Sequence, residues 1–351
     1  MGPTVSRRDT AIDVLRGLAI FTMVPANMSA LVYAEPHEMW FRVAGSFAAP
    51  LFILLSGMMV STNSVGKGYD LKYYLIRCGM LLSVAALIDV LVWHVIPFMT
   101  WDVLYVISFA MPIGYLFFKI EKAWLRWLII LAIFAAAPLL QSVLGYADYP
   151  TEISLWGEQL ELPENETNVL NHLLVDGWFP LFPWLAFGLL GGELARLRKV
   201  VDGCRTLGKW ALPLGLGLLA VGIAIWWTWP GPMLTREGYS ELFYPPTYGF
   251  MVTTVGVIVT AFSLIDLCAD WAGFQPLRVL GEAALFMYIV HQLINQYWLA
   301  GYFEEEGTTI GNFLLIDIAV VIGLMFVGWG LRKVKAAWPT KPMVARFLLG
   351  G

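Results

Sequence analysis

The feature that most constrains this chain is a series of apolar stretches, each about as long as a lipid hydrocarbon core is thick. A helix needs about 20 apolar residues to cross about 30 Å of hydrocarbon. Such windows lie near 11–33, 39–62, 74–96, 101–119, 124–143, 178–197, 209–229, 246–268, 279–300 and 310–331. Hydrophobic residues make up 59% of the sequence and charged residues 14%, which is more apolar than a water-soluble protein requires. The sequence therefore predicts an all-α, polytopic integral membrane protein of about ten transmembrane helices.

The charges between the windows alternate, and this alternation predicts the orientation of the chain. Lys and Arg favour cytoplasmic loops. The basic residues of one side are Arg7, Arg8, Lys67, Lys72, Lys119, Lys122, Arg126, Arg196, Arg198, Lys199, Arg205, Lys209, Arg278, Arg332, Lys333, Lys335, Lys341 and Arg346. The other side carries Glu152, Glu158, Glu161, Glu164, Glu166, Glu241, Glu304, Glu305 and Glu306, with Arg236 as the main basic exception. We therefore expect both termini in the cytoplasm.

Nothing in the sequence marks a second folding unit, so we expect residues 1–351 to form a single transmembrane domain. The formal net charge is only -4, and no basic aromatic patch is present. Nucleic acid is therefore not expected as a partner. No HExxH or CxxC motif occurs, and no two histidines stand at metal-ligand spacing. We accordingly expect no metal site.

The first apolar window contains polar side chains that hydrocarbon does not favour. Each ionised group costs about 2.5 to 3.5 kcal/mol in the membrane, so it should face a cavity or a partner. Asp13 and Arg16 are three positions apart and can pair on one helical face. Asn27 lies eleven positions after Arg16, about 16 Å of helical rise, on nearly the same face. Two interpretations stay open: a structural ion pair with an interhelical hydrogen bond, or a polar path across the membrane.

His37 lies in the short turn between the first two windows, ten positions after Asn27. A histidine in a loop is usually solvated surface. An imidazole titrates near neutrality and can act as a base. Its closeness to a helix that carries a polar stripe makes His37 a candidate catalytic group, together with Asn27.

A second polar group occupies the ninth window, where Tyr288, His291, Gln292 and Asn295 follow helical spacing on one face. Such a face forms a hydrogen-bonded seam between helices as often as it forms a ligand site. Weaker candidates are Asp89, His94 and Asp102 around one outer turn, His172 and Asp176 before the sixth window, and Asp317 in the last window. His94 and His172 are interpreted as surface or structural residues.

Pro180 and Pro183 disturb the first turns of the sixth window. Broken backbone is tolerated at membrane depth where it lines protein or a water-filled cavity. A helix that merely begins at proline is the plainer alternative.

Several of these stretches together resemble one enzyme family. The segments DVLRGLAIFTMVPAN, HEMW, AAPLFILLSGM and FPLFPWLAFGLLGG resemble the heparan-alpha-glucosaminide N-acetyltransferase family and its shorter bacterial forms, a branch of the transmembrane acyltransferases. The resemblance is best over residues 9–62 and 177–197. The Arg16 to Asn27 spacing resembles the Arg-x10-His motif of the related acyltransferase-3 family, with Asn27 in the place of the histidine. LGEAALFMYIVHQ resembles a C-terminal segment of those relatives, with Ala284 where serine is usual.

The resemblance implies an acyltransferase that draws acetyl groups from cytosolic acetyl-CoA and delivers them to a sugar or glycan on the other side of the membrane. It also implies that Asn27 and His37 are the catalytic pair, with Trp40 at the position of the family's tryptophan. The sequence departs from the family pattern in two ways: the spacing from Asn27 to His37 is one residue shorter, and the Asn-Gly and Asp that usually follow the tryptophan are absent. Phe41, Arg42 and Gly45 stand in that region instead. This departure leaves the identity of the acceptor open.

We therefore expect the donor, acetyl-CoA, to be held at the cytoplasmic mouth by Arg16 and Arg278, with Asp13 beside them. Tyr288 and His291 would line the cavity and orient the donor. Direct transfer and an acetyl-histidine intermediate remain alternatives. The expected partners are the lipid bilayer, acetyl-CoA and a sugar or glycan acceptor, and a homodimer is left open. A transporter or flippase that moves a polar substrate without covalent change, and a structural subunit, are the competing interpretations.

Overall fold

The computed structural model describes residues 9–147, 152–156, 168–200, 204–303 and 307–350, and helices dominate these segments. The helices are α1 (Thr10–Val32), α2 (Met39–Gly45), α3 (Ala48–Gly66), α4 (Leu71–Ile88), η1 (Asp89–Trp93), α5 (Val103–Phe117), α6 (Ala123–Leu144), α7 (Val169–Asn171), η2 (His172–Asp176), α8 (Leu181–Val200), α9 (Cys204–Thr228), α10 (Tyr248–Leu267), η3 (Ala272–Phe274), α11 (Gln275–Gly281), α12 (Ala284–Ile294), η4 (Asn295–Leu299), α13 (Ile310–Ala337) and α14 (Met343–Leu349). Extended pairing in the described segments consists of isolated bridges such as Tyr33 with Thr308. The all-α prediction is confirmed for the part of the chain that the structure describes.

The predicted apolar windows recur as helices, although their number as complete spans is smaller. Seven helical segments of the described chain are long and apolar enough to cross a membrane. They are 10–32, 39–66, 71–93, 123–144, 208–228, 248–267 and 310–337. Two further segments are pairs of helices bent by 50° and 73°, which raises the count to nine if each pair is one span. The window at 101–119 forms α5, whose 15 residues reach only about 22 Å.

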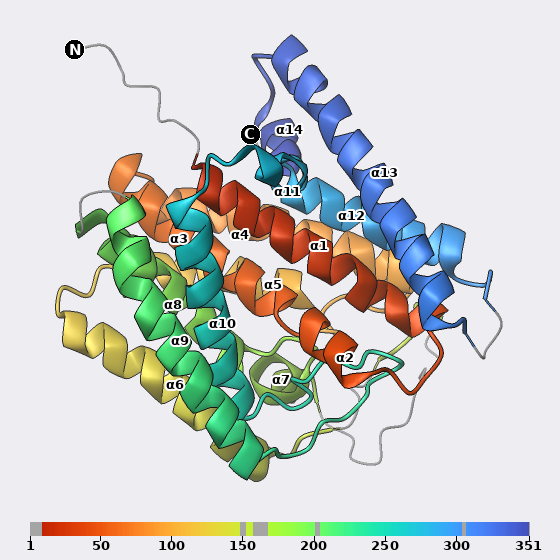
Figure 1. Ribbon diagram of the computed structural model, residues 1–351, viewed down its shortest axis with the longest axis horizontal. Coiled ribbons are helices and arrows are strands. Elements are labelled where there is room, and N and C mark those ends of the chain that lie inside the picture. The colour runs from red at the N-terminus through yellow and green to blue at the C-terminus, as the bar shows by residue number, and fades with distance from the viewer. Residues whose placement is uncertain (1–8, 148–151, 157–167, 201–203, 304–306, 351) are drawn as a thin grey trace.

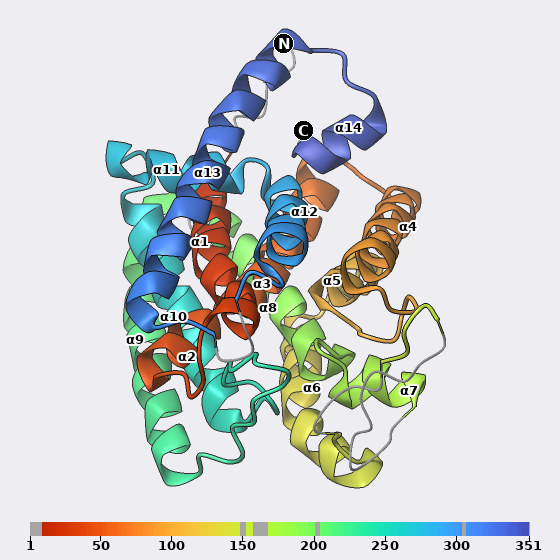
Figure 2. The same cartoon turned by 90° about the vertical axis from the view of Figure 1, so that its right-hand side faces the viewer.

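The helices form an inner group and an outer group (Figures 1 and 2). More than half of the most apolar part of α1, of the 39–66 segment and of α10 is buried, with values of 56%, 61% and 61%. The corresponding values are 11% for α6, 17% for the 208–228 segment of α9 and 22% for α13. In Figure 1, α6 and α9 follow one edge of the molecule, α13 follows the opposite edge, and α1 runs between them.

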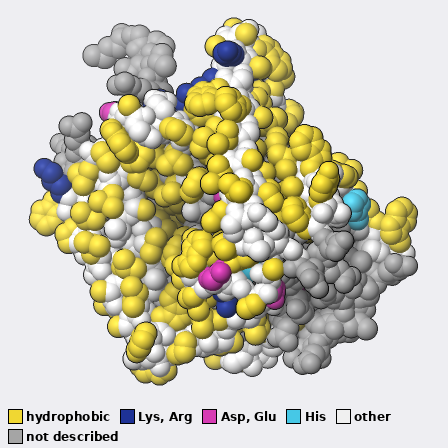
Figure 3. Space-filling model, turned by 45° about the vertical axis from the view of Figure 1, so that its right-hand side comes forward, with side chains coloured by type: hydrophobic (Ala, Val, Ile, Leu, Met, Phe, Trp, Pro, Cys, Tyr) yellow, Lys and Arg dark blue, Asp and Glu magenta, His cyan; other side chains and the backbone are white. Residues whose placement is uncertain are grey.

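Apolar side chains of the outer helices face outward. On the face drawn in Figure 3, hydrophobic side chains cover most of the described surface. Exposed examples include Leu131 on α6, Trp227 on α9 and Phe326 on α13. An apolar surface of this extent suits lipid, because water-soluble monomers rarely expose one. Several charges used to predict the orientation, among them Arg7, Arg8, Glu304, Glu305 and Glu306, lie outside the described residues.

A close contact between backbones joins α1 to α11. A Cβ atom added to Gly17 would lie 1.8 Å from the carbonyl oxygen of Leu277, and one added to Gly281 would lie 1.8 Å from that of Asp13. Helices in membranes approach closely where small residues meet. The two glycines therefore fix α11 against the first half of α1.

Of the two alternatives for the stretch around Pro180 and Pro183, the structure shows the broken backbone. Phe182 has non-helical dihedral angles (φ -103°, ψ 118°) inside α8, and this helix follows η2 at the 50° bend. The second bend lies between α11 and α12, inside the predicted window 279–300. Ala283 there has φ -136° and ψ 42°, so the window is two helices rather than one.

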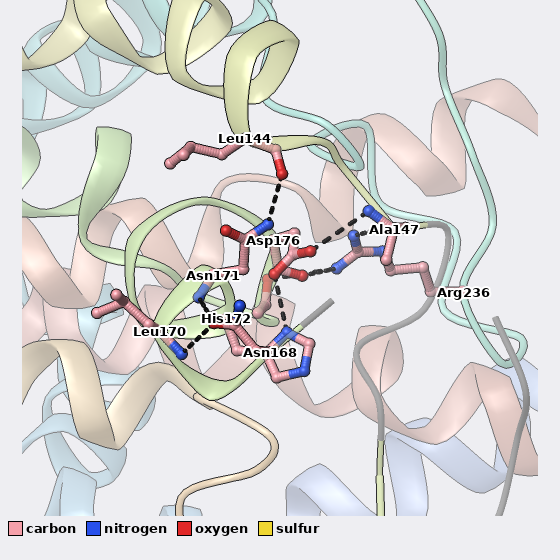
Figure 4. Close-up of polar contacts among 9 residues, drawn as sticks. Leu144, Ala147, Asn168, Leu170, Asn171, His172, Asp176 and Arg236 are labelled. Carbon is pink, nitrogen blue, oxygen red and sulfur yellow. Dashed lines mark hydrogen bonds and ion pairs between the residues drawn. The ribbon is translucent and has the colours of Figure 1, made fainter. Parts of the chain in front are cut away.

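A buried arginine ties together the loops before α8 and α10 (Figure 4). Arg236 is 0% exposed, and its guanidinium donates to the carbonyl oxygens of Asp176 (3.2 Å), Gly177 (3.3 Å) and Ala147 (2.9 Å). The Asp176 side chain in turn contacts His172 Nδ1 at 2.8 Å. Arg236 also lies over the rings of Tyr146, Trp178 and Tyr244. The basic exception in the predicted charge pattern is thus an internal residue.

Candidate active site

A small cavity lies where α1 approaches its C-terminal end and where α3, α5 and α8 begin. Its volume is about 40 Å³. The lining residues are Met23, Ala26, Asn27, Gly45, Ala48, Ala49, Phe52, Asp102, Val103, Phe179, Glu241, Phe243 and Tyr288. Four of them, Asn27, Asp102, Glu241 and Tyr288, carry polar groups that can act in hydrogen bonding or proton transfer. None of the lining residues is Lys, Arg or His.

Asn27 is held at this cavity by a histidine from α12. Its Nδ2 atom lies 3.0 Å from Nε2 of His291, which is 0% exposed. An amide nitrogen only donates, so Nε2 accepts and the ring proton is assigned to Nδ1. His291 Nδ1 lies 3.3 Å from the carbonyl oxygen of Met287, to which it donates. This arrangement uses one Nδ2 hydrogen of Asn27 and leaves the other for a group in the cavity.

The predicted polar face of α12 points inward, as its helical spacing indicated. Tyr288, His291 and Gln292 are all buried. The Tyr288 hydroxyl donates to the carboxylate of Asp102, and the Gln292 amide donates to the Tyr288 hydroxyl at 3.4 Å. Asp102, a weaker candidate in the sequence, is therefore part of the cavity and already has a strong hydrogen-bond donor.

Glu241 is the cavity residue that the sequence argument missed as a functional candidate, because it counted there only as an acidic loop charge. It lies between α9 and α10 and is 7% exposed. Its Oε2 atom has no hydrogen-bond partner among the described residues. Burial raises the pKa of the Glu241 carboxyl to about 7, although the positive charge of Arg42 acts in the opposite direction. The signal in the sequence is an acidic residue inside the apolar, proline-ended run ELFYPP.

His37 lies beside this group of residues but is absent from the lining of the cavity. Its Nδ1 atom is 2.7 Å from the Ser240 hydroxyl, and its Nε2 atom is 3.2 Å from the Tyr33 carbonyl oxygen. The ring also stacks on Tyr33, with 4.5 Å between ring centroids. Burial lowers the pKa of the His37 imidazole below its ordinary value. The structure therefore brings Asn27 together with His291 and places His37 next to the loop that carries Glu241.

The predicted donor-binding arginines lie near the start of α1 and on α11. Arg16 Nη1 is 3.5 Å from Asp13 Oδ1, as the three-residue spacing predicted. Arg278 Nε is 3.5 Å from Glu282 Oε1, and Glu282 also accepts from Arg332 at 2.8 Å. The contact of α1 with α11 at Gly17 brings the two helices together. Both arginines are about one third exposed or less, with side-chain values of 24% and 32%.

No group of three or more His, Cys, Asp or Glu side chains among the described residues is arranged to hold a metal ion. A comparison with curated proteins found no match. The family model for the catalytic part of heparan-alpha-glucosaminide N-acetyltransferase matches residues 8–222, more than half of the chain. With at least seven described helices that are able to span a membrane, the protein is an integral, multi-pass membrane protein, and the chain belongs to the heparan-alpha-glucosaminide N-acetyltransferase catalytic family.

Proposed function

We propose that this protein transfers acetyl groups from acetyl-CoA, bound at the cytoplasmic face, to an amine or hydroxyl of a sugar or glycan on the outer side. The observation that carries the proposal is the Asn27 amide at the cavity, oriented by His291 at 3.0 Å. An amide fixed by a neutral ring is a preorganised hydrogen-bond donor. A fixed hydrogen-bond donor of this kind suits the carbonyl oxygen of an acyl group. A transported solute instead needs a binding site from which it is readily released.

The proposed topology has ten spans, both termini in the cytoplasm and a single domain over residues 1–351. It counts each bent pair as one span and α5 as a short span. Gly350 approaches Glu282, and Gly281 approaches Asp13. The beginning of α1 and the end of α14 therefore meet at the same α11–α12 junction, which supports two termini on one side. The proposed location is the cytoplasmic membrane of a bacterium or an archaeon.

The donor is proposed to enter at the first half of α1. Its phosphates would meet Arg16 and Arg278, whose guanidinium groups offer charge-assisted hydrogen bonds once they exchange their carboxylate partners Asp13 and Glu282 for the donor. From Arg16 to Asn27 the helix rises about 16 Å. An extended pantetheine arm has to cover this distance for the thioester to reach the cavity. Tyr288 lines that cavity and would contact the acyl end.

At the thioester, Asn27 is proposed to donate its second Nδ2 hydrogen to the carbonyl oxygen as negative charge develops there. Attack by the acceptor also releases a proton, and His37 is proposed as the base that takes it. In the present geometry His37 would have to leave its contact with Ser240 or Tyr33 to meet the acceptor. Direct transfer and an acetyl-histidine intermediate differ in which nucleophile first meets the thioester.

The function is tested with purified protein in proteoliposomes, radiolabelled acetyl-CoA outside or inside, and a panel of amino sugars and neutral sugars. Labelled, acetylated sugar is the expected product. Asn27→Ala is expected to lower kcat by about 100 to 1000-fold, because one donor to the developing oxyanion is removed. Binding of acetyl-CoA should change little.

Asn312→Ala is the matched control, since Asn312 is exposed on α13 and contacts Thr308 at 3.2 Å. It should retain the wild-type rate. Equal rates for Asn27→Ala and wild type would remove Asn27 from the reaction. Passage of unlabelled sugar across the bilayer with no acetylated product would instead favour the transporter interpretation.

A further inference from the structure

The loop that carries Glu241 is anchored on both sides of that residue. Arg42 Nε donates to the Ser240 carbonyl oxygen at 2.6 Å, and the Leu242 backbone amide donates to the Ser46 hydroxyl at 2.7 Å. Arg42 belongs to α2, and Ser46 directly follows that helix. A fixed backbone therefore presents the Glu241 side chain to the cavity, as a binding site requires.

Glu241 and Asn27 line the same cavity, whose volume is about 40 Å³. A glycine leaves room beside Glu241. A Cβ atom added to Gly45 would lie 3.0 Å from the Ala26 Cβ and 3.7 Å from the Glu241 Cγ. Because Ala26 precedes Asn27 on α1, a ligand group that reaches Glu241 also comes close to the amide proposed to hold the acyl oxygen.

The two carboxyl groups of the cavity differ in their bonding. Asp102 accepts from the Tyr288 hydroxyl. Glu241 is 7% exposed, and its Oε2 atom has no hydrogen-bond partner among the described residues. A buried acceptor atom without a donor costs free energy in the folded protein, so its presence needs a reason. A ligand that donates a hydrogen bond to Oε2 would supply the missing partner.

The charges around the cavity favour a ligand group that is neutral or positive. Its described lining contains the carboxyl groups of Asp102 and Glu241 and no Lys, Arg or His. Arg42 is the cation that acts on Glu241, but its guanidinium is used by the backbone. Nη2 donates to the Met233 carbonyl oxygen at 3.0 Å, and Nε donates to that of Ser240. An anionic ligand group would therefore meet like charges, which weaken binding.

The proton affinity of Glu241 agrees with such a ligand. Burial raises the pKa of its carboxyl to about 7, so both forms of the carboxyl are present at neutral pH. A cation or a hydrogen-bond donor beside the group favours the carboxylate. Binding of a donor group would therefore complete the ionisation of Glu241, whereas an anion would oppose it.

We propose that Glu241 binds the acceptor sugar and selects it by charge. Its carboxylate accepts a hydrogen bond from a hydroxyl or ammonium group beside the reacting one, and it disfavours acceptors that carry a carboxylate or phosphate near that group. This inference rests on the proposed acetyl transfer and names the charge class of its acceptor. His37 remains the base for the reacting group. Hydroxyl and amino groups stand on adjacent carbon atoms of a sugar ring, so two side chains can meet two neighbouring groups at once.

The test uses three monosaccharides of similar shape and different charge, namely glucosamine, glucose and glucuronate. Rates with radiolabelled acetyl-CoA give kcat and KM for wild type, Glu241→Gln and Asp102→Asn. Wild type is expected to use glucuronate about 10-fold less efficiently than glucose, or worse. Glu241→Gln should raise the KM for glucosamine by about 10 to 100-fold, because a hydrogen bond to a charged partner is lost. Its KM for acetyl-CoA should change little.

The order of the acceptors should change as well. In Glu241→Gln the efficiency with glucuronate relative to glucose should rise by about 10-fold, because one negative charge is removed. Asp102→Asn should alter the acceptor KM values less, since that carboxyl already has the Tyr288 hydroxyl as its donor. Glu121→Gln is the control and should match wild type, because Glu121 is exposed in the turn before α6 and lies outside the cavity lining.

Unchanged acceptor KM values in Glu241→Gln would overturn the inference, and so would a wild type that uses glucuronate as efficiently as glucose. If Glu241→Gln is not recovered folded, the acceptor series of the wild type decides alone. Absence of acetyl transfer in wild type with every acceptor would reject the proposed function itself. Calorimetric binding of glucosamine then decides the inference separately: weaker binding to Glu241→Gln than to wild type upholds it, and equal binding contradicts it.

Discussion

At the scale of single residues, the site depends on how one side chain fixes the hydrogens of another. His291 is neutral in the assigned tautomer, with Nδ1 donating to Met287 and Nε2 accepting from Asn27. The Asn27 amide can then neither rotate nor exchange its oxygen and nitrogen without losing a buried hydrogen bond. His291, which the sequence predicted to line the cavity and orient the donor, contacts Asn27, the group that is proposed to bind the thioester oxygen.

Substitution of His291 separates these two roles. His291→Ala is expected to lower kcat by up to about 100-fold, because a loosened Asn27 amide is misplaced relative to the reacting carbonyl. The KM for acetyl-CoA should stay near the wild-type value. His291→Gln, which can accept a hydrogen bond, should recover part of the rate. A raised KM with an unchanged kcat would instead assign His291 to donor binding, and steady-state kinetics of the three proteins distinguishes the outcomes.

At the scale of elements, the contact of α1 with α11 places the two arginines proposed to bind the donor on adjoining helices. Gly17 faces the Leu277 carbonyl, where no side chain fits. The sequence predicted the apolar windows and the polar stripe on α1, since both follow from periodicity. It did not predict the bend at Ala283, because Glu282, Ala284 and Leu285 favour a helix and a single glycine, Gly281, is tolerated inside one. The bend is visible only in the structure. There α11 packs against α1, and α12, which carries His291, runs in a different direction.

Gly17→Ala is therefore expected to destabilise the protein by about 1 to 3 kcal/mol, as overpacking of a filled interior does. It should also raise the KM for acetyl-CoA by shifting Arg278 relative to Arg16. Gly79→Ala is the matched control, because Gly79 is inside α4 with open space around its Cβ position, and alanine favours a helix. Thermal unfolding followed by size-exclusion chromatography compares the two. Equal melting temperatures would show that α1 and α11 can separate at no cost.

At the scale of the whole molecule, the part of the fold that could be predicted from the sequence is the part encoded locally. Apolar windows, the proline break and the ion pair of Asp13 with Arg16 are all short-range. The cavity is not, because Asn27 and His291 are 264 positions apart and Glu241 comes from a loop. The match to the family model also covers residues 8–222 only, so Glu241, Tyr288 and His291 lie beyond the matched region. In the region where the sequence departs from the family pattern, Arg42 donates to the carbonyl oxygen of Ser240, next to Glu241, and Gly45 lines the cavity with Glu241.

Loss of Arg236 should affect several segments at once, because its guanidinium joins Ala147, Asp176 and Gly177. Arg236→Met fills a similar volume but leaves the carbonyl oxygens of Ala147, Asp176 and Gly177 without their donor. Breaking such a buried charged network is expected to cost about 3 to 5 kcal/mol. Arg236→Lys should cost less, since it keeps the charge but lacks the planar fork. Melting temperatures of the purified variants measure the effect, and a Met variant as stable as wild type would contradict it.

The same arginine has a consequence for biosynthesis. Residues 147, 176 and 177 leave the ribosome long before Arg236, whose guanidinium donates hydrogen bonds to their carbonyl oxygens. Until the hairpin of α9 and α10 has been inserted, the carbonyl groups of these earlier residues lack their shared donor and the cavity lacks Glu241. A nascent chain arrested before that hairpin would therefore consist of inserted helices with an incomplete cavity. Such a chain would be exposed to quality-control proteases until translation proceeds.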